Sequence, residues 1–227
     1  MKPQAKSLST LVEEQCKKWE IANTRKGSDS RQPVVSVSRQ AGSIGRAVAK
    51  KLADETGMQL YGISIINRVA EDAGVREAVV RSLDEKSRPW LENLIAAWEG
   101  KENIAVDDFL RALVRIIGTI GRHGNAIILG RGGAFILPAP QNFRVRFIAP
   151  LPVRIRSFTR ELRITADEAE KRIGEIDAGR RKFVKTYFGA DVDDPIHYDL
   201  VVNNEALSTG EAVGLVRSAL ALRRGSQ

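Results

Sequence analysis

Short apolar runs alternate with amphipathic segments along most of the chain. The runs predict strands at 34–37, 59–61, 126–129, 144–149 and 199–202. Apolar positions spaced three and four residues apart predict helices at 45–56, 63–73, 107–122, 151–162, 166–187 and 209–222. Short apolar strands that alternate with helices indicate an α/β fold, in which helices cover both faces of a parallel sheet.

The ends of several predicted helices carry recognisable signals. Thr165 is followed at the third position by Glu168, and Ser208 in the same way by Glu211. This spacing is typical of a capping box at a helix N-terminus. The helix at 107–122 is expected to stop at His123-Gly124, because glycine readily adopts the conformation that ends a helix.

The first 31 residues are set apart from the alternating pattern. Their apolar residues have helical spacing over 7–22, and residues 24–33 are polar and rich in turn formers. We therefore expect an N-terminal helical extension and linker at 1–31, followed by one domain at 32–227. The extension is expected to pack on this domain or on a partner, which includes self-association with a second copy.

Composition narrows the class of protein further. The chain has 227 residues, one cysteine, two histidines and a formal net charge of +8. No apolar run approaches the roughly 20 residues of a membrane span, and we find no signal peptide, so a cytoplasmic protein without membrane partners is expected. The positive charge fits either a nucleic-acid surface or a pocket for small polyanions. Because no basic strip with interleaved aromatic residues is present, we favour the pocket.

Residues 34–49, VVSVSRQAGSIGRAVA, form the most informative segment. A β-branched strand leads into a glycine turn and then a helix, an order that presents backbone N–H groups and a helix N-terminus to a phosphate. Against the pattern G-x-x-x-x-G-K-[ST], Gly45 fits the second glycine, Arg46 replaces the lysine and Ala47 replaces the hydroxyl residue. Arginine can bind phosphate through its planar fork. An ordinary strand-to-helix turn with tightly packed glycines is the alternative.

Arginines elsewhere could bind an anionic substrate. Arg131 follows the strand at 126–129, and ligands of open parallel sheets bind at the carboxyl ends of strands. A further basic cluster lies on the helices at 151–162 and 166–187, where it could stabilise charge or merely form a solvated face. Asp84-Glu85 could position a cation or a substrate hydroxyl, although such a pair is more often solvated. The aspartates near His197 lack the spacing of metal ligands, so we assign no protein metal site.

Together these segments resemble the cytidylate kinase-like family, a branch of the P-loop nucleoside monophosphate kinases, over roughly residues 33–222. The matching motifs are VSVSRQAGSIGRAVAKKLA (35–53), LDEK (83–86), AIILGRGGAFIL (126–137), VRFIAPLPVRIR (145–156), EIDAGRR (175–181) and YDLVVNNEALS (198–208). The resemblance implies a three-layer α/β/α P-loop nucleotide kinase fold with a central parallel sheet. It also implies a substrate-binding insertion at about 62–105 and a helical lid at about 157–195.

The same resemblance implies site residues and cofactors. ATP would bind at the loop and at Arg154; the loop residues are Gln40, Ala41, Gly42, Ser43, Ile44, Gly45, Arg46 and Ala47. The acceptor phosphate would contact Arg131, Asp177 and Arg180, with Arg46 and Arg180 as catalytic residues. Mg²⁺ would be held mainly through phosphates and water, because Ala47 offers no ligand.

Three departures from the family pattern bear on function. Gly132 stands where cytidylate kinases carry aspartate, Ile173 stands where the lid carries a further arginine, and Ile44 makes the loop less glycine-rich. The favoured function is ATP-dependent phosphoryl transfer to a nucleoside monophosphate or a related small phosphate. A nucleotide-binding regulatory protein without turnover and a basic nucleic-acid-binding protein are the alternatives.

Overall fold

A parallel sheet forms the centre of the computed structural model, which describes residues 33–71, 73–83, 87–100 and 107–225. Within these residues the sheet has five strands in the order β2-β3-β1-β4-β5. The strands are β1 (Val34–Arg39), β2 (Gln59–Tyr61), β3 (Ala126–Leu129), β4 (Asn142–Ile148) and β5 (Leu200–Asn203). The five predicted strands are therefore confirmed to within two residues at each end.

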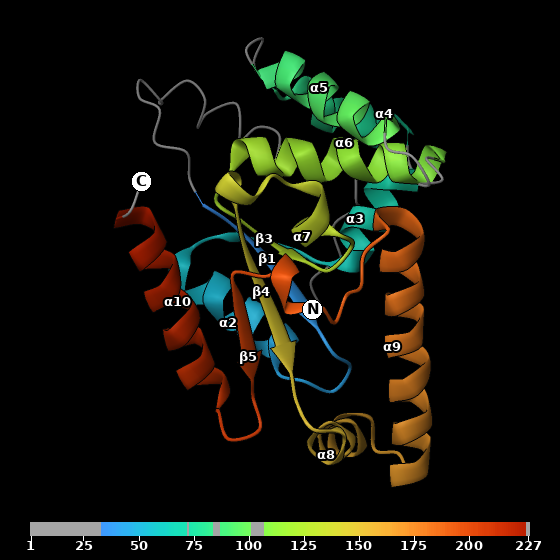
Figure 1. Cartoon of the computed structure of the whole chain (residues 1–227), viewed down its shortest axis with the longest axis vertical. Helices are drawn as coiled ribbons and strands as arrows, with labels where there is room; N and C mark the ends of the chain where they lie inside the picture. The colour runs from blue at the N-terminus through green and yellow to red at the C-terminus, as the bar shows by residue number, and fades with distance from the viewer. Residues whose placement is uncertain (1–32, 72, 84–86, 101–106, 226–227) are drawn as a thin grey trace, which may run out of the picture.

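Helices cover both faces of this sheet (Figure 1). One face packs on α2 (Gly45–Thr56) and α10 (Thr209–Gly225). The other packs on α3 (Ile63–Glu71), α4 (Ala73–Arg81), α5 (Ser87–Glu99), α6 (Asp108–His123) and α7 (Gly133–Ile136). Two further helices, α8 (Leu151–Leu162) and α9 (Ala166–Phe188), pack against each other beside the sheet. The predicted three-layer arrangement is confirmed.

Alternate residues of the central strands enter different cores. Val34 of β1 and Ile128 of β3 join the core under α3–α6, whereas Val35 of β1 and Ile127 of β3 join the core under α2 and α10. Successive side chains of a strand point to opposite faces, so both faces of a covered strand must be apolar. This requirement explains why these strands read as continuous apolar runs.

The predicted helix ends agree with the structure. Thr165 and Glu168 form a reciprocal capping box at the start of α9, and Ser208 and Glu211 exchange the same bonds before α10. Gly124 caps α6 and donates its N–H to the carbonyl of Ile120.

Three helices were not predicted, namely α4, α5 and α7. The single turn of α7 is too short to show a helical period. The expected N-terminal extension and Asp84-Glu85 lie outside the described residues. The boundaries expected for the extension, the insertion and the lid stay predictions.

Among the described helices, none has the length and the apolar character that a membrane span requires.

Candidate functional site

The loop between β1 and α2 can be formed only with glycine at two positions. Gly42 has a φ of +78°, and a Cβ built on it would lie 2.6 Å from the carbonyl oxygen of Arg154. A Cβ on Gly45 would lie 2.8 Å from the Cβ of Arg39. Both glycines therefore permit close backbone packing, which was the alternative interpretation of this turn, and this packing is compatible with anion binding.

Protein oxygen atoms already accept hydrogen bonds from part of the loop. Ala41 N–H donates to Asp177 Oδ1 at 2.8 Å, and Ile44 N–H donates to Asn204 Oδ1 at 3.3 Å. Ser43 N–H donates to the carbonyl of Gln40. A carboxylate bound to a loop N–H shows that the loop accepts an anion. A phosphate at Ala41 N–H would have to displace Asp177.

The remaining loop residues differ in their contacts. Gln40 links the loop to the end of β4, since its Oε1 accepts a hydrogen bond from Ala149 N–H at 3.1 Å. Arg46 and Ala47 are exposed in the first turn of α2. Arg46 lies close enough to Arg39 for its charge to lower the pKa of that arginine. Arg46 is therefore free to reach a ligand, whereas Gln40 has a structural contact.

Arg154 of α8 links the loop to α9. Its guanidinium donates to the carbonyls of Ala149 and Ala41 and to Asp177 Oδ2, the last at 2.7 Å. The Arg154 and Asp177 side chains are 12% and 11% exposed, so this ion pair is largely shielded from water. The structure thus brings Arg154 to the loop and gives it protein partners there, and its contact with ATP stays a prediction.

Arg180 ties α9 to the end of β1. Its Nη1 donates to the carbonyl of Arg39 at 2.9 Å and to Asp177 Oδ1 at 3.4 Å. Burial is the main factor that lowers the pKa of Arg180, while the Asp177 carboxylate opposes the change. Because Asp177 and Arg180 lie one helical turn apart, α9 brings both of them to the loop.

The Gly130–Gly132 turn after β3 presents Arg131. Its three residues all have positive φ, with 81° at Gly130, 51° at Arg131 and 74° at Gly132. Such values are uncommon for a non-glycine residue such as Arg131. The Arg131 guanidinium lies 5.5 Å from the ring centre of Phe183 on α9, and burial lowers its pKa.

Gly132 packs against the aromatic ring of Phe188 on α9. A Cβ built on it would overlap the ring of Phe188. That ring stacks on Phe135, with ring centres 5.3 Å apart and planes 11° apart. An aspartate at this position would have to move Phe188. The sequence suggested a lost polar contact here, and the structure adds that an aromatic ring occupies the corresponding space.

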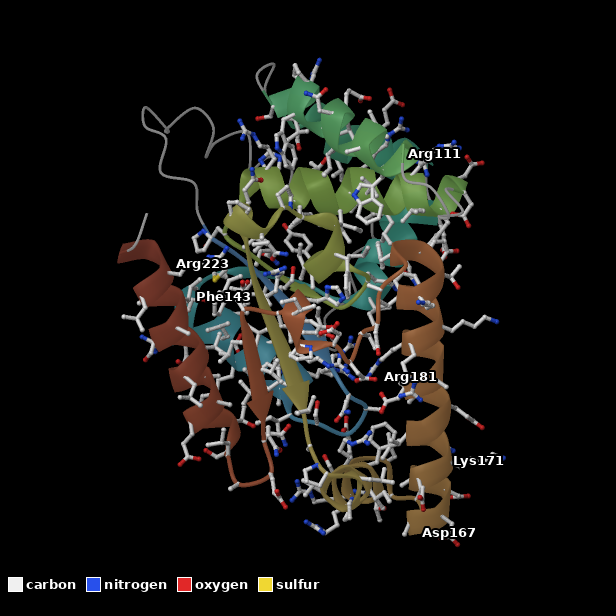
Figure 2. The ribbon with its side chains drawn as sticks, in the orientation of Figure 1. Arg111, Phe143, Asp167, Lys171, Arg181 and Arg223 are labelled. Carbon is white, nitrogen blue, oxygen red and sulfur yellow. The ribbon has the colours of Figure 1, made fainter. Side chains whose placement is uncertain are left out.

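A cavity of about 270 Å³ lies between these elements. Its wall includes five arginines from β1, the turn after β3, β4 and α9, namely Arg39, Arg131, Arg146, Arg180 and Arg181. Figure 2 labels Arg181 on α9. Asp177 and Asp193 also line the cavity. Small-molecule sites usually combine apolar walls with a few charged groups, so this excess of arginine favours an anionic ligand.

Sequence reasoning missed Arg39 and Arg146. Arg39 ends β1, and Arg146 of β4 donates to Ser38 Oγ at 2.8 Å and pairs with Asp193. The rule that indicated Arg131, a basic residue at the carboxyl end of a parallel strand, applies equally to Arg39. Arg146 carried no such signal, because it lies within an apolar strand.

Of the aspartates near His197, Asp193 lines the cavity, whereas Asp199 lies apart from it. Asp199 pairs with Arg144 and Arg223 at the β4–β5 edge. Among the described residues, no group of three histidine, cysteine, aspartate or glutamate side chains is placed to hold a metal ion.

The sheet order, the glycine loop between β1 and α2 and the basic carboxyl edge define an α/β protein with the P-loop kinase fold. The chain belongs to the cytidylate kinase-like family, whose model matches residues 34–206.

Similar proteins agree with this assignment. A cytidylate kinase from Ignicoccus hospitalis is 31% identical over 182 residues, covering 79% of this chain and 94% of that protein. One from Pyrococcus horikoshii is 24% identical over 188 residues, covering 82% and 88%. The crystal structure of an uncharacterized protein from Eubacterium ventriosum shares the fold, with a TM-score of 0.67, 18% identity, and coverage of 83% and 97%.

Proposed function

We propose that the protein transfers the γ-phosphoryl group of ATP to a nucleoside monophosphate of the cytidylate type, or to a related small phosphate. The arginine-lined cavity beside the glycine loop is the observation that carries this proposal. The names of the relatives support it, because they are cytidylate kinases. Phosphoryl transfer requires positioning and positive charge more than covalent chemistry from the protein.

In this proposal, different residues bind the phosphates of the donor and the phosphate of the acceptor. Backbone N–H groups of the loop, together with Arg46, hold the donor phosphates. Arg131 holds the acceptor phosphate, and Arg180 stabilises charge on the transferred group. Asp177 positions Arg180 and Arg154 through the ion pairs described above.

ATP supplies the phosphoryl group, and a loop that binds the Asp177 carboxylate through Ala41 N–H fits an anionic donor. Magnesium is held mainly through phosphates and water. Ala47 has no side-chain oxygen, and Asp177 and Asp193 are already paired with arginines. We therefore assign no protein side chain as a metal ligand.

A coupled ADP-release assay across CMP, dCMP, UMP and AMP, with and without Mg²⁺, tests the proposal. We expect several acceptors to be used, with kcat/KM values within about a thousand-fold of one another, because no carboxylate at Gly132 selects the base. Arg131→Ala should lower kcat/KM for the best acceptor by roughly 10- to 100-fold, since a charge-assisted bond to phosphate is lost. Absence of ADP release with every acceptor would refute the proposal.

Arg46→Ala tests the donor site. We predict that it weakens ATP binding by roughly 10- to 100-fold, because the charge-assisted bond from the exposed Arg46 guanidinium to phosphate is lost. Calorimetry measures the affinity, and Arg217→Ala is the control because it removes one charge from the exposed α10–α2 pair with Glu55. Unchanged ATP affinity in a folded Arg46→Ala protein would remove Arg46 from the donor site.

A nucleotide-binding regulatory protein on the same fold is the second candidate. The observation in its favour is that Asp177 occupies Ala41 N–H, while Ala47 lacks the hydroxyl of the usual loop. In this case the wild-type protein would bind ATP in calorimetry and release no ADP with any acceptor. The two measurements together therefore separate the candidates.

A further inference from the structure

The arginines around the cavity are not equally compensated by negative charge. Asp177 pairs with Arg154 and Arg180, and Asp193 pairs with Arg146 and Arg181. Both aspartates that line the cavity are thus already engaged. Among the described residues, neither Arg39 nor Arg131 has a carboxylate partner. Within the described part of the chain, these two are therefore the arginines of the cavity wall that have no ion-pair partner, and we call them uncompensated in this sense.

Arg39 lies in a setting that disfavours its charge. It is half-buried at the end of β1, and its guanidinium packs on Gly130, where an added Cβ would lie 2.6 Å from Nη1. Burial is the main factor that lowers the pKa of Arg39 to about 9. The charges of Arg180, Arg46 and Arg131 lower it further, and the charge of the Asp177 carboxylate, which is already paired with other arginines, opposes them. An arginine surrounded by cations and shielded from water is unfavourable unless an anion joins it.

Unpartnered polar atoms lie on the same wall. Ser36 Oγ, Arg131 Nε and Arg146 Nε are buried, and each is without a hydrogen-bond partner in the part of the chain that is described. All three residues line the cavity. Buried polar atoms are nearly always paired, so three unpaired atoms at one cavity indicate groups prepared for a ligand.

We infer that Arg39 and Arg131 together form the binding subsite for the phosphate of the acceptor, with Arg39 as a substrate-binding residue in addition to those proposed above. Calling the bound molecule an acceptor rests on the proposed function. Two uncompensated cations match the charge of a phosphate monoester dianion, whereas a neutral alcohol would leave both unpaired. The subsite therefore selects a small molecule that already carries a phosphate.

The test compares Arg39→Met with Arg217→Ala, which removes one charge from an exposed pair outside the cavity. Calorimetry without ATP measures the binding of CMP, cytidine and inorganic phosphate. We expect wild type to bind CMP at least ten-fold more tightly than cytidine. Arg39→Met should weaken CMP and phosphate binding by roughly 10- to 100-fold, and Arg217→Ala should leave both unchanged.

Two further readouts exclude a merely structural role. Arg39→Met removes a half-buried cation from among other cations, so the free variant should melt at the same temperature as wild type or higher. The carbonyl that accepts from Arg180 belongs to the backbone and remains in the variant. ATP affinity should change by less than about three-fold, because Arg39 is assigned to the acceptor side and acts on the donor only at a distance.

The outcomes separate this inference from the proposed function. If wild type turns over CMP while Arg39→Met keeps full CMP affinity, the inference is wrong and the proposed function stands. If Arg39→Met loses ATP affinity instead, Arg39 belongs to the donor site and the inference is also wrong. If phosphate binds through Arg39 but no acceptor is phosphorylated, the subsite stands and the proposed function fails. Absence of phosphate and CMP binding by wild type would overturn the inference.

Discussion

Individual residues at this site are constrained as much by packing as by chemistry. Gly132 is the clearest example, because its φ of +74° disfavours any side chain and an added Cβ would overlap the ring of Phe188. An aspartate at this position, as expected from the resemblance to cytidylate kinases, would have to displace the Phe188 ring of α9. Arg131, the preceding residue, keeps its positive φ of 51° at some conformational cost and so presents its guanidinium to the cavity.

We predict that Gly132→Ala destabilises the protein by about 2–4 kcal/mol. The new Cβ both enters a left-handed conformation and displaces the ring of Phe188. Gly174→Ala is the matched control, because Gly174 lies in α9 with no atom within 4 Å of an added Cβ, and alanine should stabilise that helix by about 0.5–1 kcal/mol. Urea denaturation measures both changes. Equal stability of the two variants would contradict the proposed close packing.

At the scale of elements, the carboxyl edge depends on how α9 and the last strands are anchored. The 23 residues of α9 carry Asp177 and Arg180 to the loop, and Phe188 to the turn after β3.

Asp199 lies directly before β5 and links the start of this strand to β4. Its carboxylate accepts from Arg144 Nε at 3.1 Å and Nη2 at 2.9 Å, and pairs with Arg223 of α10 at 3.1 Å. Figure 2 labels Arg223 beside Phe143 of β4, and the Arg223 Cζ atom lies 5.7 Å from the centre of the Phe143 ring.

Asp199→Asn should lower the free energy of unfolding at neutral pH by about 1 kcal/mol. Burial alone would raise the pKa of Asp199, but the hydrogen bonds and charge of Arg144, with the charge of Arg223, hold the pKa below its ordinary value of 3.8. A depressed folded-state pKa gives stability that is present above pH 3.8 and lost as the pH falls through the folded-state value.

The measurement is urea denaturation of wild type and Asp199→Asn at several pH values. The difference between them should be full at pH 7 and shrink below pH 3.8. Asp54→Asn, at an exposed position on α2, controls for the change in net charge. A difference that persists unchanged in acid would show that the carboxylate charge does not contribute.

For the whole molecule, the two cores on opposite faces of the sheet set the boundaries of the folded unit. Both cores draw their described residues from Val34 onward. The core under α2 extends past the family match at 206, because α10 contributes Ala212, Val213, Val216 and Leu220. The folded unit therefore includes α10, while the domain bounds of 32–227 stay a prediction.

We predict opposite effects for two truncations. A chain of residues 32–227 should keep the unfolding midpoint of the full chain, because both described cores remain. A chain of residues 1–206 should not fold, because each buried valine or leucine of α10 stabilises by about 1.5–3 kcal/mol and total stability is only about 5–15 kcal/mol. Circular dichroism with urea tests both. A lower midpoint for 32–227 would show that residues 1–31 stabilise the domain.

The sequence by itself determined the strands, the main helices, the α/β class and the glycine loop. Each depends on local rules, namely apolar runs, helical spacing, the Thr165–Glu168 capping box and turn-forming glycines. The same rules placed Arg131 at the carboxyl edge, because any residue after a parallel strand lies there.

Only the tertiary structure decided which charges meet at that edge. Asp177 lies 136 positions after Ala41, and Arg180 lies 141 positions after Arg39, yet both pairs are in hydrogen-bond contact. Partners this far apart are set by how α9 packs on the sheet, which no local pattern records. The pairing of both cavity aspartates leaves Arg39 and Arg131 without an ion-pair partner among the described residues, and this too is decided by tertiary contacts.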